Sequence, residues 1–569
     1  MPKILPIEDK LLQNMPAATL AGRLMALPAP KRLATLLERN DAEAVVAALS
    51  EPDFYLFVKE LDPGSAAPLL AMARPEQLTH LIDIDGWQGD ELLAGKTIAW
   101  CEAMLTANEA RFLDWLYRVD FEFLVVLFQK WLDRVVIAGE EDRDFQEEND
   151  ALPQLTVDNQ YYFSTLYPAH EPLLKYILGY LFETHHGFYR SLLHSVQAGM
   201  ETEVNELAYR FHRGRLADHA IPDAEEAATV YRPLKATQLP RDKVVMPTDS
   251  EDPARPPTFA LAMVHGDDLL STALARIDDA ATRATLQQEM AALANKMVVI
   301  DKLEPDEPTS LLRGAAKAAA TVNLGLDLLC AGDAALATEA LTGIYLENLF
   351  RLGHTRLATL RNRLTDILEH DWLSRWPNGL NLLDEPWLEI VDLLAAKTPM
   401  CLRPQPRGLP TAEDYLRTGA DLARAEECAA VIEALAPLFS DCERCLAGDW
   451  SGLAARLHAK AQIHDLAEIT LGSMILTGAA NFIWHGNWEI TPLPVAHWGE
   501  VAPRLAPSTL EAAIAQRLRE LTPEKSGRDL AQRYLQPLFD RYREEMEGRD
   551  QLPDPRLVHC FLFGDPPPQ

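Results

Sequence analysis

Residues 15–84 repeat a short helical unit whose first residue recurs at near-constant spacing. The unit starts are Pro16, Pro28, Asp41, Pro52, Pro63 and Pro75, which lie 11 to 13 residues apart. Proline suits the first turn of a helix, because its missing N–H would have no partner there in any case. A unit of this length holds two or three turns and cannot bury its apolar face without its neighbours. The spacing therefore predicts an all-α chain that opens with a superhelix of short stacked helices.

The apolar side chains within the units support this prediction. Phe54, Phe57, Val58 and Leu61, for example, recur three and four residues apart, which places them on one face of a helix. Pro68 would interrupt the fifth unit unless Ser65 is its N-cap, because Pro68 then falls in the first turn. Beyond the units, residues 110–137 are predicted to form one further helix.

The pattern from Leu27-Pro28 to Leu36-Leu37 resembles the cytoplasmic N domain of MgtE magnesium transporters and its relatives in the flagellar switch protein FliG. The resemblance implies a helical repeat domain over residues 1–138. A magnesium transporter needs transmembrane helices, whereas the two long apolar stretches here, 121–138 and 466–484, are interrupted by polar and charged residues such as Lys130 and Glu468. We expect both stretches to be buried helices and the chain to have no membrane span.

Composition restricts the partners and the compartment. The 569 residues include 53 basic and 85 acidic ones, which gives a net charge of −32. A field of this sign repels phosphate groups, so we expect no nucleic-acid partner, while basic protein surfaces stay attractive. Seven cysteines at wide spacings give no disulfide framework, and the first residues lack the apolar core of a signal peptide. These features predict a cytoplasmic protein.

Three stretches interrupt the helical pattern: an acidic run at 139–150, and proline clusters at 239–258 and 398–411. They predict a helical repeat domain at 1–138, an acidic linker at 139–160, a helical domain at 161–238, a Pro-rich linker at 239–258, a helical domain at 259–397, a Pro-rich linker at 398–411, a C-terminal helical domain at 412–563 and a frayed tail at 564–569. The last helical block is expected to open at Thr411.

A second resemblance covers most of the chain. The run from Arg215 to Asp218, the run from Glu225 to Ala227 and the later Leu349-Phe350-Arg351-Leu352-Gly353 look like an uncharacterised bacterial family known only as a domain of unknown function. That family has no assigned activity, so the resemblance implies no catalytic residue.

An acidic turn from Asp83 to Glu91 is the first candidate site. It fails the calcium-loop template, because Trp87, Gln88 and Ala94 stand where an acid, a glycine and a glutamate are needed. We interpret the turn as a solvated loop that caps a helix and expect Trp87 to pack on the last repeat; a cation site is the alternative.

Two clusters of basic side chains are further candidates. His185, His186, Arg190 and His194 lie partly along one helix face, and we favour a polar face over a metal site. Arg351, His354, Arg356, Arg361 and Arg363 form a basic face for which internal acidic partners are favoured over an anionic ligand or RNA.

Cys442, Cys445, His458 and His464 match the ligand spacing of a zinc finger. A finger needs its cysteines on a hairpin, whereas Cys442 and Cys445 end or follow a helical run, so we expect no metal here.

No phosphate loop, nucleophile elbow or metalloprotease helix is present in the sequence. We therefore predict no catalytic, cofactor-binding or metal residues and no cofactor. The interpretation that fits best is a helical scaffold or adaptor that binds protein partners through its N-terminal repeat surface. A divalent-cation-responsive regulator and an enzyme with an unrecognised site are the alternatives, and the oligomeric state is left open.

Elemental analysis can test the zinc-finger interpretation. Protein purified without added metal should contain well below one zinc per chain, because the cysteines lie in helical surroundings that lack a finger's core. Stoichiometric zinc that disappears in Cys445→Ser would contradict this expectation.

Overall fold

The computed structural model describes residues 12, 14–137, 153–198, 201–244, 256–304, 307–404, 410–457, 469–546, 553–554 and 558–564. The chain divides into two compact units, residues 1–351 and 352–569. Helices dominate both units and the strands are short, which confirms the all-α fold class. The finer domain boundaries drawn from the linkers stay a prediction, and the acidic run at 139–150 lies outside the described residues.

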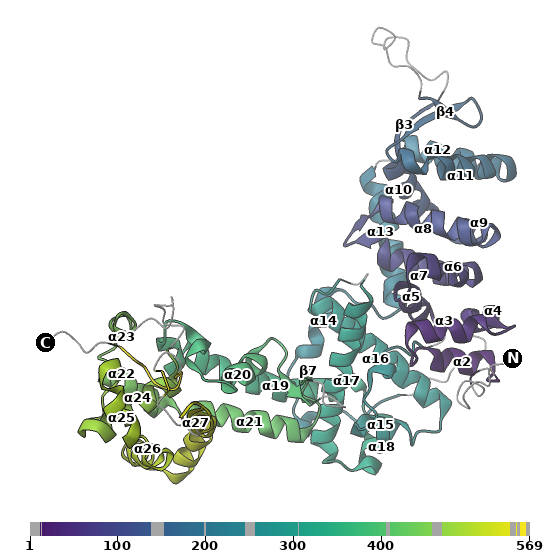
Figure 1. The fold of residues 1–569 in the computed structure, drawn as a ribbon. Helices are drawn as coiled ribbons and strands as arrows, with labels where there is room; N and C mark the ends of the chain where they lie inside the picture. Colours follow the sequence, from purple (N-terminus) through teal and green to yellow (C-terminus); the bar gives the residue numbers. More distant parts are fainter. Residues whose placement is uncertain are drawn as a thin grey trace, which may run out of the picture. The chain divides into compact units, whose positions relative to one another are not determined.

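The first unit opens with the predicted stack of short helices. They are α2 (Ala17–Leu24), α3 (Ala29–Leu37), α4 (Ala42–Ala47), α5 (Glu51–Lys59), α6 (Pro63–Met72), α7 (Pro75–Asp85), α8 (Ala94–Ala107) and α9 (Glu109–Arg118). From α2 to α7, each begins within one residue of its predicted start. Helix α5 packs on α7, α6 on α8 and α7 on α9, so the helices form successive layers (Figure 1).

The prediction for Pro68 was wrong. Helix α6 begins at Pro63 with Asp62 as its N-cap residue, so Ser65 is not the cap and Pro68 lies inside the helix. The N–H that proline lacks would have bonded the carbonyl of Gly64. Gly64 is exposed, so water can satisfy that carbonyl and the helix continues.

Residues 110–137 do not form one helix either. The backbone is extended at Val119 and Asp120, and it separates α9 from α10 (Phe121–Trp131). The β-branched run at the end forms strand β3 (Leu132–Ile137), which pairs antiparallel with β5 (Tyr161–Thr165), and β5 pairs in turn with β4 (Leu155–Thr156). Cross-strand pairing with residues almost thirty positions later therefore decided the structure of this segment.

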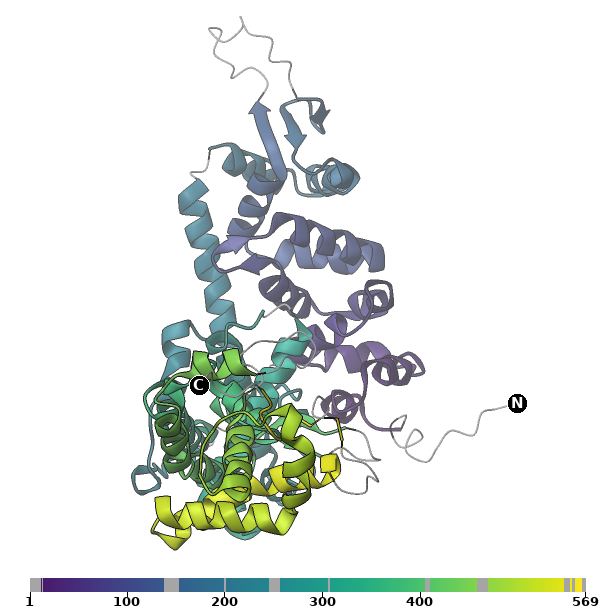
Figure 2. The ribbon, with the colours of Figure 1, turned by 60° about the vertical axis from the view of Figure 1, so that its left-hand side comes forward.

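Two helices complete the layers and a third runs back along them. Helices α11 (Glu171–Thr184) and α12 (His186–Ala198) pack together, and α13 (Glu201–Asp218) extends beside the stack against α10 and α7 (Figure 2). The rest of the unit comprises α14 (Ala224–Ala228), α15 (Leu269–Leu274), α16 (Ala280–Ile300), α17 (Pro308–Cys330), α18 (Ala334–Gly343) and the start of α19 (Leu346–Glu369). Turns of 3-10 helix lie at Pro168–His170, Thr229–Tyr231, Ala236–Gln238 and Leu261–Met263.

A buried carboxylate joins the stack to the later helices. Asp53 of α5 accepts hydrogen bonds from the Thr258 amide at 2.8 Å, the Thr258 hydroxyl at 3.0 Å and the Phe259 amide at 2.9 Å. Burial raises the pKa of Asp53, although these donors oppose the shift. The segment that follows the Pro-rich stretch is thereby fixed against α5.

The second unit is also helical around an aromatic core. It contains α20 (Trp387–Ala395), α21 (Gly419–Glu433), α22 (Ala436–Cys445), α23 (Trp450–Arg456), α24 (Leu471–His485), α25 (Trp498–Val501), α26 (Pro507–Leu521), α27 (Lys525–Met546) and 3-10 turns at Trp372–Arg375, Gly379–Leu382, Val495–His497 and Ala502–Arg504. Trp372 and Trp450 both contact the Phe439 ring, with centroids 5.3 and 5.7 Å away.

The last helical block does not open at Thr411. Strand β6 (Met400–Arg403) pairs antiparallel with β7 (Ala412–Tyr415), so this stretch forms a hairpin. Helix α21 begins later because Thr418 and Asp421 cap it reciprocally: each side chain accepts the other residue's backbone N–H, at 3.1 Å in both cases.

No single helix in the described part of the chain is long and apolar enough to cross a membrane. Helices α17 and α18, bent by 115° where they meet, pass that test together on length and composition alone.

Substituting Gly314 should test the close packing of α16 on α17. A Cβ at Gly314 would lie 2.8 Å from the Ala294 carbonyl oxygen and 3.0 Å from Val298, so Gly314→Ala must push the helices apart. We expect the free energy of unfolding to fall by about 1–3 kcal/mol in urea denaturation. Gly179→Ala in α11 is the control, because a Cβ there meets nothing within 4 Å and should stabilise by about 0.5–1 kcal/mol. Equal effects of the two substitutions would contradict the packing argument.

Candidate functional site

Asp83, in the last turn of α7, is the point where α13 is held against the stack. The Arg215 guanidinium donates to both carboxylate oxygens of Asp83, each at 2.7 Å, and also pairs with Asp120. His212 Nδ1 lies 3.1 Å from Asp83 Oδ1. Burial raises the pKa of Asp83, but the hydrogen bonds from Arg215 and His212 outweigh burial and leave the pKa below its ordinary value. Asp83 is therefore an ionised carboxylate inside the protein.

Asp83 and Trp87 fix the orientation of the His212 ring. The ring stacks on Trp87 with centroids 4.4 Å apart and planes within 9° of parallel. Since Nδ1 faces a carboxylate, we assign the proton to Nδ1 in the neutral ring. Nε2 then carries the lone pair, and it has no hydrogen-bond partner among the described residues.

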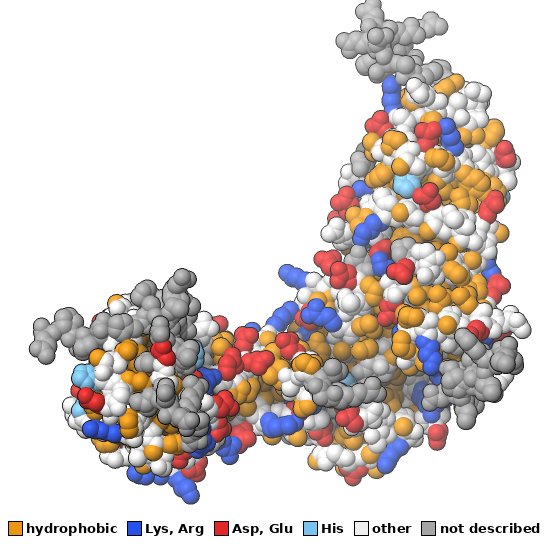
Figure 3. All heavy atoms as spheres, in the orientation of Figure 1, with side chains coloured by type: hydrophobic (Ala, Val, Ile, Leu, Met, Phe, Trp, Pro, Cys, Tyr) orange, Lys and Arg blue, Asp and Glu red, His pale blue; other side chains and the backbone are white. Residues whose placement is uncertain are grey.

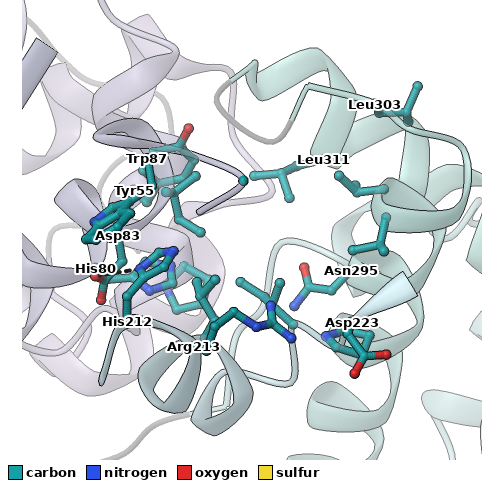
Figure 4. A pocket seen from close by; sticks show the side chains of 18 of the residues that line it. Tyr55, His80, Asp83, Trp87, His212, Arg213, Asp223, Asn295, Leu303 and Leu311 are labelled. Carbon is teal, nitrogen blue, oxygen red and sulfur yellow. Dashed lines mark hydrogen bonds and ion pairs between the residues drawn. The ribbon is translucent and has the colours of Figure 1, made fainter. Parts of the chain in front are cut away.

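His212 lines a partly open cavity of about 380 Å³ within the first unit. One side is formed by the stack and the opposite side by α16 and α17 (Figure 4). The walls are mainly aromatic and aliphatic, and they include Tyr55, Ile84, Trp87, Tyr209, Leu216, Ile221, Phe259, Val298, Val299, Leu303 and Leu311. Arg213, Asp223, Asn295 and Lys302 are polar residues in the same lining.

Two histidines meet at the edge of this cavity: His80, which is buried and lines it, and His219, which is half-buried. The rings of His80 and His219 meet edge to face with centroids 4.3 Å apart. Burial lowers the pKa of His80 to about 3 and also lowers the pKa of His219. Both rings are therefore neutral near pH 7, and Nδ1 of His80 is buried with no hydrogen-bond partner in the described structure.

Asn295 of α16 closes the C-terminal end of α13. Its amide nitrogen donates to the carbonyl oxygens of His219 at 3.1 Å and Ala220 at 3.4 Å. The amide oxygen of Asn295 has no partner among the described residues, so it is an acceptor available to a ligand.

A histidine that is hydrogen-bonded to a carboxylate can act as a general base. Here the charge of Asp83 is shared with Arg215, which reduces its effect on His212. Among the described lining residues, Tyr55 and Tyr209 carry the only hydroxyl groups and there is no thiol.

The acidic turn differs from both interpretations made from the sequence. Asp83 and Asp85 are buried, and Asp85 accepts from Lys59 at 2.8 Å and from the Trp100 indole at 2.5 Å. The residues that follow form the hairpin of β1 (Trp87–Gln88) and β2 (Glu91–Leu92). Trp87 stacks on His212 of α13 in addition to its contact with the last repeat. Three of the four acids, Asp83, Asp85 and Glu91, pair with cationic side chains, and Asp90 is exposed.

Four members of the two basic clusters contact other side chains of the protein. The His185 ring packs on Tyr117 with centroids 4.4 Å apart, and the His186 ring packs on Phe182 with centroids 5.0 Å apart. The two histidine rings therefore contact different aromatic residues. In the second unit, Arg356 pairs with Glu426 at 2.7 Å and Arg363 pairs with Glu433, which confirms the expected internal partners for these two residues.

The candidate zinc ligands are only partly described. Cys442 and Cys445 both lie on α22, and burial raises the pKa of each thiol. His458 and His464 lie outside the described residues.

Residues 9–564 match the family described as Family of unknown function (DUF6178). The chain belongs to this family. The match covers nearly the whole of this chain and confirms the resemblance to an uncharacterised family. No curated protein and no solved structure matches the chain, so the resemblance to the MgtE N domain has no support beyond its sequence pattern.

The acidic turn identified Asp83 and Trp87 as candidates from the sequence of this DUF6178 chain, but His212, Arg213 and Asn295 were not identified as candidate site residues. His212 and Arg215 lie three residues apart on one helix face, which was a usable signal for a shared partner. Their partner Asp83 is 129 and 132 residues away in the sequence, so no local pattern connects them.

The burial of His80 should make the DUF6178 chain acid-sensitive. Above about pH 6.5 the ring is neutral in both folded and unfolded chains. As the pH falls from there toward 3, the unfolded chain gains a proton that the folded chain excludes, so the free energy of unfolding should fall by up to about 1.4 kcal/mol per pH unit.

Urea unfolding of wild type and His80→Leu at several pH values between 7 and 4.5 measures this contribution. The slope of the unfolding free energy against pH should be smaller in His80→Leu, by an amount that corresponds to at most one proton. His194→Gln, at an exposed position on α12, should keep the wild-type slope. Parallel curves for wild type and His80→Leu would show that His80 is not the responsible group.

Proposed function

We propose that the first unit is a ligand-binding module that takes a small organic molecule into the cavity beside His212. One observation carries the proposal: a histidine oriented by a buried carboxylate has a partner-free Nε2 at an otherwise largely apolar cavity. Ligand sites combine apolar walls with a few oriented polar groups in this way.

The size of the cavity supports a small molecule. Binding pockets for small ligands span roughly 300–1,000 Å³, and the cavity here measures about 380 Å³. Aromatic rings such as Tyr55, Trp87 and Phe259 offer flat apolar surface, while His212 and Asn295 offer directional hydrogen bonds. A compact molecule with an apolar body and a polar end matches this lining.

The adaptor function predicted from the sequence is the alternative, and the surface gives it less support. Exposed large apolar side chains of the first unit include single ones, such as Leu37 of α3 and Leu166 after β5, and one pair a turn apart on α13, Leu207 and Phe211. Apolar, acidic and basic side chains lie side by side on the visible face of the stack (Figure 3). Single exposed leucines of this kind are common on proteins and do not mark a docking surface.

The cation-responsive alternative gains no support from the acidic turn, because its buried acids are paired with Arg215 and Lys59. Within the described residues, no group of three or more His, Cys, Asp or Glu side chains is suited to a metal ion.

Fluorescence titration with phenylnaphthylamine, a neutral apolar dye, can test the proposal. We expect saturable binding of one dye per chain to the wild type. Leu311→Trp adds a larger side chain to the cavity wall. It should weaken dye binding by about tenfold or more, because little space is left in the cavity. Leu37→Trp, at a 52% exposed position outside the cavity, is the matched control and should leave the affinity unchanged.

Thermal unfolding of the same proteins provides the second readout. A dye that binds only the folded chain should stabilise the wild type by about 2.7 kcal/mol at a hundredfold excess over its Kd, and should stabilise Leu311→Trp far less. Saturable binding with equal affinity in Leu311→Trp would place the dye elsewhere, and absence of saturable binding would count against the module.

A further inference from the structure

We infer that the ligand of this cavity is an organic anion and that Arg213 binds its charged group. The inference rests on the proposed function, and it adds the chemical class of the ligand and the residue that selects it. It comes from the pairing of charges inside the first unit, from the position of Arg213 and from the cationic side chains that lie unpaired at the cavity among the described residues.

Cationic side chains in the interior of the first unit generally have an acidic partner. Arg74 pairs with Glu51 at 2.7 Å, Lys317 with Asp301 at 2.7 Å and Lys243 with Glu289 at 2.8 Å, and Arg215 is bound by both Asp83 and Asp120. Such pairing is expected where acids outnumber bases by 85 to 53. Arg213 is different, because it forms no ion pair or side-chain hydrogen bond with any described residue.

The position of Arg213 makes this difference significant. Arg213 follows His212 on α13, is half-buried, and extends across the cavity toward Asn295 and Asp223 (Figure 4). Withdrawing a guanidinium from water without a partner costs free energy, and an anion in the cavity would offset that cost. Arg210, one turn earlier on the same helix, faces solvent and pairs with Glu206 at 2.7 Å.

The remaining charges around the cavity favour an anion. Asp83 is compensated by the two hydrogen bonds from Arg215. Asp223 is occupied as the N-cap of α14, where its side chain accepts the Glu226 amide at 2.8 Å. Lys302, exposed at the end of α16, adds a second cation to the lining. Arg213 and Lys302 have no ion-pair partner among the described residues, and an anionic group in the cavity would supply one.

The other groups define the rest of the molecule. Nε2 of His212 and the amide oxygen of Asn295 can each accept a hydrogen bond from one donor group of the ligand, such as a hydroxyl or an amine, near the charged end. Val298, Leu303 and Leu311 then cover an apolar body. The matching class is a carboxylate, sulfonate or phosphate ester on a compact aromatic or branched aliphatic body.

Two dyes that share one skeleton can test the inference. Anilinonaphthalene sulfonate carries an anionic group, and phenylnaphthylamine is the neutral counterpart. Arg213→Gln should weaken binding of the sulfonate dye by about tenfold, which corresponds to the loss of one charge-assisted hydrogen bond. It should change the affinity for the neutral dye by less than about twofold. Arg213→Lys should give an intermediate loss for the sulfonate, because the charge stays but the guanidinium fork is removed.

Arg210→Gln is the matched control and should leave the affinity of both dyes unchanged. Equal weakening of both dyes in Arg213→Gln would mean that Arg213 shapes the cavity without selecting charge, and no effect on either dye would remove Arg213 from the site. Both results would overturn the inference while the cavity still binds the neutral dye. If the neutral dye does not bind the wild type at all, the proposed function itself fails.

Discussion

The first unit depends on the compensation of one buried charge. Asp83 lies at the end of a short helix in the stack, and among the described residues its carboxylate is satisfied by α13 alone, through Arg215 and His212. Removing one partner of a buried ion pair typically costs about 3–5 kcal/mol, because the other charge stays buried and unpaired. The contact therefore fixes the position of α13 along the stack. The same contact orients His212, so stability and the candidate site share one interaction.

A second buried carboxylate completes the walls of the cavity. Asp53 binds the amides of Thr258 and Phe259, and Phe259 is part of the lining. The stack, α13 and the pair of α16 and α17 come from distant parts of the sequence, yet all three contribute to one cavity. A ligand there would contact all three and would stabilise their arrangement, since binding to the folded state alone shifts the folding equilibrium.

The charge of the chain is best understood from these internal contacts. A net charge of −32 gives no indication of function beyond repulsion of phosphate polymers. Most interior cations are neutralised by the abundant acids, as Lys317 is by Asp301. Against that background Arg213, which has no partner among the described residues and lies at a cavity, is more informative than the overall charge, because it is where we propose that an external anion is held.

The sequence alone determined the fold class and the starts of helices α2 to α7, because proline and cap residues act within one helical turn. Only the tertiary structure decided the features that depend on distant partners. Strand β3 replaced a predicted helix because β5 pairs with it, and Pro68 is accommodated inside α6, where Gly64, whose carbonyl loses its helical partner, is an exposed residue.

The cavity and its polar groups could not be predicted for the same reason. Asp83 and His212 are 129 residues apart, and the partner-free state of Arg213 is a property of its surroundings in space. Helix starts are local and can be read from neighbouring residues, whereas the compensation of a buried charge depends on which distant segment packs beside it.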